Sequence, residues 1–307
     1  MMRATLWGRK VGQPLVPMPH IAFGTPRKLP KPEQLKGRVV VLDIAFAAGP
    51  DGASFERTTK PFIDGLGKRL AAWIDHHDHL LHAQFASDPR FVLRTKAEHG
   101  ACPEMVTPER VAAAGRVDTI CCHNDFDGLC SAAKWILGGV EPYPGADDDA
   151  RAIDTRLGTP SERAIILDRA LRARPRDDAM AGLVVRFLAG RAEDRALFSE
   201  IETAAEAMRP REDEARRIAT GYRASGDVAF VQVPSPHDPY DKTLLLMIGQ
   251  ERARISVVAD GTTVTVAARF DSGVNLLELL NIDGGMPTVV SVNSKRLAEV
   301  LETLGYR

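Results

Sequence analysis

The sequence has few cysteines, and none is spaced as a pair that would bind metal or build a disulfide framework. Four of its 307 residues are cysteine, and two of these are adjacent. A chain with so few thiols and no framework is typical of a cytoplasmic protein. It also lacks an apolar signal core near its first residue and any run of the ~18 apolar residues that a membrane span needs. We therefore expect a cytoplasmic protein without a membrane anchor.

The sequence also lacks an excess of either charge. Its 40 basic and 41 acidic residues give a formal net charge of −1. A protein that coats long nucleic acid needs a basic surface, and no aromatic-plus-basic stripe for a single strand is present. Long duplex is thus disfavoured as a partner, whereas a small nucleotide substrate is not excluded. With 44% apolar residues, the chain can build a sizeable core and two ordinary domains.

Two clusters of aspartate and histidine are the informative feature. The first, residues 75–79, reads Asp-His-His-Asp-His and follows an apolar segment. The second carries His123, Asp125 and Asp127 after another apolar segment, and alternation along extended chain would point these three side chains to one side. Imidazole and carboxylate groups are the usual ligands of Zn, Mn and Fe. Two such clusters in one domain predict a two-metal site.

The motif His-x-Asp-x-Asp-Gly at residues 123–128, taken together with Asp75-His76-His77, resembles the DHH phosphoesterase superfamily. That superfamily includes single-strand exonucleases, oligoribonucleases, cyclic-dinucleotide phosphodiesterases and family II inorganic pyrophosphatases. Its members usually carry the His-x-Asp-x-Asp motif before the DHH triplet, whereas here the triplet comes first. The catalytic domain therefore looks circularly permuted. A parallel sheet allows this, because it gathers its site at the carboxyl ends of the strands whatever their order in the chain.

We expect an α/β fold with a mostly parallel sheet, helices on both of its faces, and a smaller C-terminal α+β domain. Buried strands are predicted at residues 38–45, 73–74 and 117–122, helices at 60–72 and 128–137, and a loop at 142–150. The expected division is an irregular, proline-rich N-terminal arm at 1–36, a metal-binding catalytic domain with permuted motif order at 37–190, a helical linker at 191–225, and a substrate-binding domain at 226–307.

The resemblance implies two Mn²⁺-like ions that activate a water molecule, with Mg²⁺, Fe²⁺ or Co²⁺ as alternatives. Asp43 ends the first buried strand, where a lone aspartate is ordinarily a cap or turn residue, but the resemblance favours it as the ligand that bridges both ions. The implied ligands of the first ion are His123, Asp125 and Asp43, and those of the second are Asp127, Asp43, His76 and Asp154. For the last carboxylate, Asp154 is preferred to Asp147, Asp148 and Asp149, whose acidic run is ordinarily solvated.

Two further residues are predicted to be catalytic. His77 would face the phosphate and stabilise it or protonate the leaving oxygen. Asp75 would hold a histidine in the required tautomer.

The C-terminal domain is expected to bind the substrate. The resemblance implies a Gly-Gly-Gly-His loop for the substrate phosphate, and this chain has Asp283-Gly284-Gly285-Met286 instead. Backbone amides of Gly284 and Gly285 could still meet an anion, although a plain turn is the alternative. Asn293, Lys295 and Arg296 are further candidates, and solvated surface is an equal interpretation of the two cations.

The resulting hypothesis is a metal-dependent phosphoesterase that hydrolyses a short oligonucleotide or a small nucleotide phosphoester. A non-catalytic nucleotide or metal sensor that retains the fold is the alternative, and a structural zinc protein using the histidines and cysteines is a further rival. Whether the chain forms a homodimer stays open.

Overall fold

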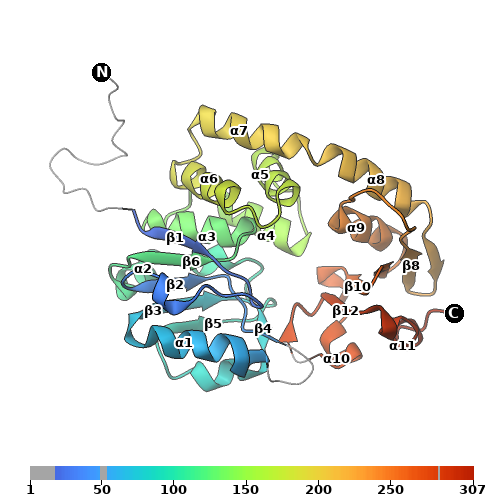
Figure 1. Ribbon diagram of the computed structural model, residues 1–307, viewed down its shortest axis with the longest axis horizontal. Coiled ribbons are helices and arrows are strands. Elements are labelled where there is room, and N and C mark those ends of the chain that lie inside the picture. Colours follow the sequence, from blue (N-terminus) through green and yellow to red (C-terminus); the bar gives the residue numbers. More distant parts are fainter. Residues whose placement is uncertain (1–17, 49–53, 283) are drawn as a thin grey trace.

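The computed structural model describes residues 18–48, 54–282 and 284–307. Its N-terminal part is an α/β unit built on a five-stranded sheet in the order β1-β6-β2-β3-β5, in which every neighbouring pair of strands is parallel (Figure 1). The strands are β1 (His20–Phe23), β2 (Val39–Leu42), β3 (Leu70–Asp75), β5 (Phe91–Leu93) and β6 (Thr119–Cys122).

Helices cover both faces of this sheet. Continuous apolar strands such as β2, in which all four residues are buried, are typical of a sheet covered on both sides. Helix α1 lies below the sheet in Figure 1, and α3 to α7 lie above it. These helices, with the short α2, are α1 (Lys60–Leu66), α2 (Pro108–Ala114), α3 (Phe126–Ile136), α4 (Ala146–Thr155), α5 (Glu162–Ala173), α6 (Asp178–Ala189) and α7 (Arg195–Glu206).

The two faces of the sheet bury different cores. Val40 and Leu42 pack with the helices on one face, and Val39 and Val41 pack into an aromatic core on the other, as alternation along β2 requires. Trp73 in β3 belongs to this aromatic core. Its indole Nε1 donates a hydrogen bond of 2.9 Å to the carbonyl of Ile44, and so holds the segment that follows β2.

The C-terminal part is a smaller α+β unit on a second sheet, in the order β12-β10-β9-β8-β7. Only the β8–β9 pair is parallel. One face packs against α8 and α9, and the other against α10 and α11. These elements are α8 (Arg209–Ala219), β7 (Arg223–Ser225), β8 (Val228–Gln232), α9 (Lys242–Arg252), β9 (Ile255–Asp260), β10 (Thr263–Ala268), α10 (Leu276–Leu280), β12 (Val289–Asn293) and α11 (Leu297–Thr303). The predicted fold class is therefore confirmed.

The two units touch through a short strand pair. Strand β11 (Gly284–Gly285) pairs antiparallel with β4 (Asp78–His79), which directly follows the Asp-His-His triplet (Figure 1). A second link is the ion pair between Arg172 of α5 and Asp241, the residue that caps α9. Among the described residues, the helices are all too short or too polar to cross a membrane.

Three details of the predicted architecture are wrong. Residues 20–23, expected in an irregular arm, form β1 and extend the sheet beyond β6; residues 1–17 of that arm lie outside the described part. The expected loop at 142–150 contains the start of α4, because three aspartates in a first helical turn are stabilised by the helix dipole. The expected helix at 60–72 ends at Leu66, and Leu70 to Ala72 join β3, where burial in the sheet outweighs the helix propensity of alanine.

Candidate metal centre

The carboxyl ends of three adjacent strands meet at one point. Asp43 follows β2, His76 follows β3 and His123 follows β6, with β2 between the other two strands. His76 Nε2 lies 3.2 Å from Asp43 Oδ1, and His123 Nδ1 lies 3.8 Å from Asp43 Oδ2. Residues that are up to 80 positions apart in the chain are thus brought together around Asp43.

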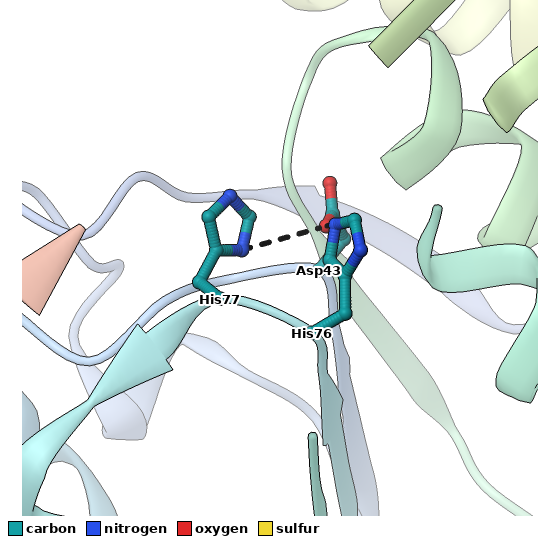
Figure 2. Close-up of side chains that lie close together, drawn as sticks. All are labelled: Asp43, His76 and His77. Carbon is teal, nitrogen blue, oxygen red and sulfur yellow. Dashed lines mark ion pairs between the residues drawn. The ribbon is translucent and has the colours of Figure 1, made fainter. Parts of the chain in front are cut away.

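Asp43 is buried and has an energetically unfavourable backbone conformation. Its side chain is 1% exposed, and its backbone has a φ of 59°, in the left-handed region that non-glycine residues seldom adopt. Neither carboxylate oxygen has a hydrogen-bond partner of acceptable geometry among the described residues, although His76 and His77 both face it (Figure 2). Burial, followed by repulsion from Asp127 and Asp125, raises the pKa of this carboxyl. A buried carboxylate without hydrogen bonds destabilises a fold, which makes Asp43 a candidate ligand of a cation.

Three overlapping groups of side chains around Asp43 could each hold a metal ion. Within each group the potential ligand atoms lie within 4.8 Å of one another. The donors are carboxylate and imidazole groups, which suit Mn²⁺, Fe²⁺ or Mg²⁺ and differ from the thiolates of a typical structural zinc site. The four cysteines are buried, and none belongs to a group. The groups are Asp43 with His123 and Asp125, Asp43 with His76 and His77, and His76 with Asp127 and Asp154.

The start of α3 explains the spacing of the second motif. Asp125 caps this helix, and its Oδ1 accepts a hydrogen bond of 3.4 Å from the amide of Gly128. Asp127 lies in the first turn, with Oδ2 3.3 Å from His76 Nε2. A Cβ atom at position 128 would come 2.6 Å from the carbonyl of His123 and 3.0 Å from Asp43 Oδ2. The site therefore requires glycine there, because the helix approaches the ligands so closely.

His76 is oriented by a backbone carbonyl. Its Nδ1 bonds to the carbonyl of His99 at 2.9 Å, which directs Nε2 toward the carboxylates. Such a bond to the second ring nitrogen is the usual support of a metal-binding histidine. Burial opposes a charge on this ring, but Asp127 and Asp43 outweigh burial and raise the pKa of His76 to about 11. The surplus of negative charge is what a bound cation would neutralise.

His77 and Asp75 form a separate pair beside the cluster. His77 Nδ1 lies 2.8 Å from Asp75 Oδ1. Burial would raise the pKa of the Asp75 carboxyl, but His77 outweighs burial and lowers it. His77 also lines a cavity of about 790 Å³ together with Asp43 and His123. The pair therefore presents an oriented imidazole to a space that adjoins the predicted ligands.

The acidic run on α4 is engaged elsewhere, which leaves Asp154 facing the cluster. Asp147 pairs with Lys134, Asp148 accepts from Arg151 at 3.1 Å, and Asp149 accepts from the Tyr143 hydroxyl at 2.8 Å. Asp154 Oδ2 lies 3.9 Å from His76 Nε2. Among the four carboxylates weighed from the sequence, only Asp154 belongs to a ligand group.

The cluster contains one residue that sequence analysis did not identify. Lys96 is 2% exposed; its Nζ lies 3.1 Å from His76 Nε2 and forms an ion pair with Asp154. Burial opposes its charge, but Asp154 and Asp127 outweigh burial and raise the pKa of Lys96. Nothing in the surrounding Thr-Lys-Ala-Glu segment distinguishes this lysine from a solvated one.

The candidates in the C-terminal unit separate into two groups. Gly284 and Gly285 lie beside the DHH triplet, through the β11–β4 pair. The other candidates are at the opposite end of β12, a strand about 13 Å long at ~3.3 Å per residue. There the Asn293 side chain caps the amide of Lys295 at 3.0 Å, and Arg296 pairs with Glu299 at 2.6 Å. The structure does not bring Asn293, Lys295 or Arg296 to the cluster, because β12 runs away from it.

Comparison with known proteins adds a distant likeness to a solved structure. No family model and no curated protein matches the sequence. A solved structure of a pGpG-specific phosphodiesterase, PggH from Vibrio cholerae, is 13% identical and covers 88% of this chain and 97% of its own, with a TM-score of 0.42. A likeness this loose assigns no function.

Proposed function

We propose that the chain is a metal-dependent phosphoesterase of the DHH type, acting on a short oligonucleotide or a small nucleotide phosphoester. The main support is Asp43, whose buried oxygens have no hydrogen-bond partner among the described residues and which belongs to two of the three potential ligand groups. A divalent ion bound there would generate a nucleophile from water at neutral pH and offset the charge that develops on the phosphate.

Separate residues of the chain would bind the ion, contact the phosphate and orient the catalytic histidine. Asp43, His123 and Asp125 would hold an ion at the edge of the 790 Å³ cavity, with Mn²⁺ preferred and Mg²⁺, Fe²⁺ or Co²⁺ compatible with the same donors. His77 would bind the phosphate or protonate the leaving oxygen from the wall of this cavity. Asp75 would keep the His77 ring oriented.

We expect Asp75→Asn to lower phosphoesterase activity by about 10- to 100-fold, the usual effect of removing the partner of a working histidine. The amide can still meet His77 Nδ1, but it cannot hold the ring with a negative charge. The change should leave the amount of bound Mn²⁺ unaltered, because Asp75 pairs with His77 and not with Asp43, His123 or Asp125, which would hold the ion. Steady-state kinetics with metal analysis test this, and loss of the ion from Asp75→Asn would contradict the assigned role.

The dimensions of the site favour a small substrate. A second cavity, of about 630 Å³, lies between Asp154 of α4 and Met286 of the C-terminal unit, so cavities adjoin the cluster on two sides. Both volumes are within the usual range for small ligands, roughly 300–1,000 Å³. The basic residues that line the first cavity are Arg27, Lys28 and Arg176, enough for a few phosphates and not for a long backbone.

We expect catalytic efficiency to be highest for substrates of one to a few nucleotides and not to increase with strand length. A length series at fixed Mn²⁺ and salt measures this. A steady increase in kcat/KM with length, together with a steep decrease with salt, would show that the protein binds a long backbone and would contradict the prediction.

The experiment that tests the proposed function is a metal-supplemented screen of phosphodiesters and phosphomonoesters, including linear dinucleotides, with a chelator control. Turnover that requires the metal supports the phosphoesterase, whereas metal or nucleotide binding without turnover supports the sensor. The zinc hypothesis is disfavoured, because the four cysteines lie outside the ligand groups. A cytoplasmic location and a homodimer stay predictions.

A further inference from the structure

Lys96 occupies a position where a second ion would be expected. The group His76, Asp127 and Asp154 has the donor types and the close spacing of a metal site. The Lys96 ammonium contacts two of its three members, His76 Nε2 at 3.1 Å and the Asp154 carboxylate. An ammonium has no lone pair and cannot bind a metal ion, and the Lys96 ammonium lies against the donor atoms that an ion would need.

The segment that carries Lys96 is tied down at several points. The amide of Lys96 donates to Asp78 Oδ2 at 3.2 Å, directly after the DHH triplet. One residue before it, the amide and hydroxyl of Thr95 donate to Glu98 at 2.8 and 2.9 Å. Three residues after it, the carbonyl of His99 accepts the bond from His76. The same segment therefore orients His76 and places the Lys96 ammonium against it. These several hydrogen bonds fix Lys96 as a structural part of the site.

The group of Asp43, His123 and Asp125 differs in its access to solvent from the group that Lys96 contacts. The His123 and Asp125 side chains are 26% and 47% exposed, and His123 lines the 790 Å³ cavity. In contrast, His76 is fully buried and Lys96 is 2% exposed. A catalytic metal site keeps a position open for water or substrate. Only the group of Asp43, His123 and Asp125 is both open and free of the ammonium, because Lys96 contacts His76, which belongs to the other two groups.

We propose that the Lys96 ammonium permanently fills the position between His76, Asp127 and Asp154, so that the protein binds a single divalent ion, at Asp43, His123 and Asp125. This inference depends on the proposed metal-dependent function and changes its site from two ions to one ion and one lysine. The lysine supplies a fixed positive charge that keeps Asp127 and Asp154 in place beside the ion.

The test is the Mn²⁺ stoichiometry of the full-length protein, by equilibrium dialysis with elemental analysis, and its low-temperature electron paramagnetic resonance spectrum. The wild type should bind one equivalent and give the six-line signal of an isolated Mn²⁺. Lys96→Met removes the ammonium and exposes the second ligand group, so it should bind two equivalents and give an exchange-coupled signal.

Lys134→Met is the matched control. Lys134 is also a buried lysine paired with an aspartate, Asp147, but it contacts no residue of the ligand groups, so this variant should still bind one equivalent. Two equivalents in the wild type would overturn the role of Lys96 and leave the proposed function standing. One equivalent in a folded Lys96→Met protein would also overturn it. No bound ion in the wild type would overturn both. If Lys96→Met fails to fold, Lys96→Gln replaces it, and the wild-type stoichiometry decides.

Discussion

Replacing Asp43 by asparagine should lower phosphoesterase activity by about three orders of magnitude and abolish tight Mn²⁺ binding, an effect at the upper end for loss of one preorganised group. Asp43 belongs to two of the three ligand groups, and its neutral isostere offers the ion no charge. Asparagine is also among the few residues that tolerate a φ of 59°, so the turn after β2 is kept. The loss should therefore come from the site and not from unfolding.

The same variant should be at least as stable as the wild type without metal. In the folded protein, burial and then repulsion from Asp127 and Asp125 disfavour the ionised carboxylate, and a neutral side chain removes that penalty. In chelator, we expect the midpoint temperature of unfolding of this variant to equal or exceed that of the wild type. The increase in midpoint temperature that Mn²⁺ confers on the wild type should be absent from the variant. Thermal unfolding with and without Mn²⁺ measures both effects. Undiminished turnover, or an unchanged Mn²⁺-dependent increase in the midpoint, would remove Asp43 from the site.

Asp125→Asn should lower activity by about 10²- to 10³-fold with little change in stability. Asp125 is a predicted ligand whose side chain is 47% exposed, so its replacement disturbs little packing. Asp125 also contacts His123 Nδ1 at 2.6 Å and caps α3 through the amide of Gly128, and asparagine caps helices as well as aspartate does. We expect the free energy of unfolding to stay within about 0.5 kcal/mol of the wild type.

Asp148→Asn provides the comparison for this experiment. Asp148 is another exposed aspartate near a helix start, on α4, but it pairs with Arg151 and belongs to no ligand group. Its replacement should leave kcat, KM and bound Mn²⁺ unchanged. Wild-type activity in both variants would show that Asp125 is not a ligand. The same loss of activity in both would show that any surface charge in this region matters.

The sequence by itself indicated most residues of the candidate site. The apolar runs that became β2 and β6 are buried on both faces, and polar residues follow each of them directly. Because parallel strands end at one edge of a sheet, this pattern was sufficient to bring Asp43, His76 and His123 together whatever their order in the chain. The motif ends in Gly128, and the structure supplied the reason, since a close approach of helix and candidate ligands excludes a side chain there.

Only the tertiary structure decided which charged side chains are buried and which partners they contact. Lys96 is an ordinary loop lysine in the sequence, and it becomes a component of the site because the segment is folded over His76. Asp154 differs from Asp147 only in its partners: Lys134 holds Asp147, whereas Asp154 faces the cluster. The direction of β12 likewise carries Lys295 away from the site. Such partnerships depend on contacts between distant segments, and local sequence patterns carry no information about them.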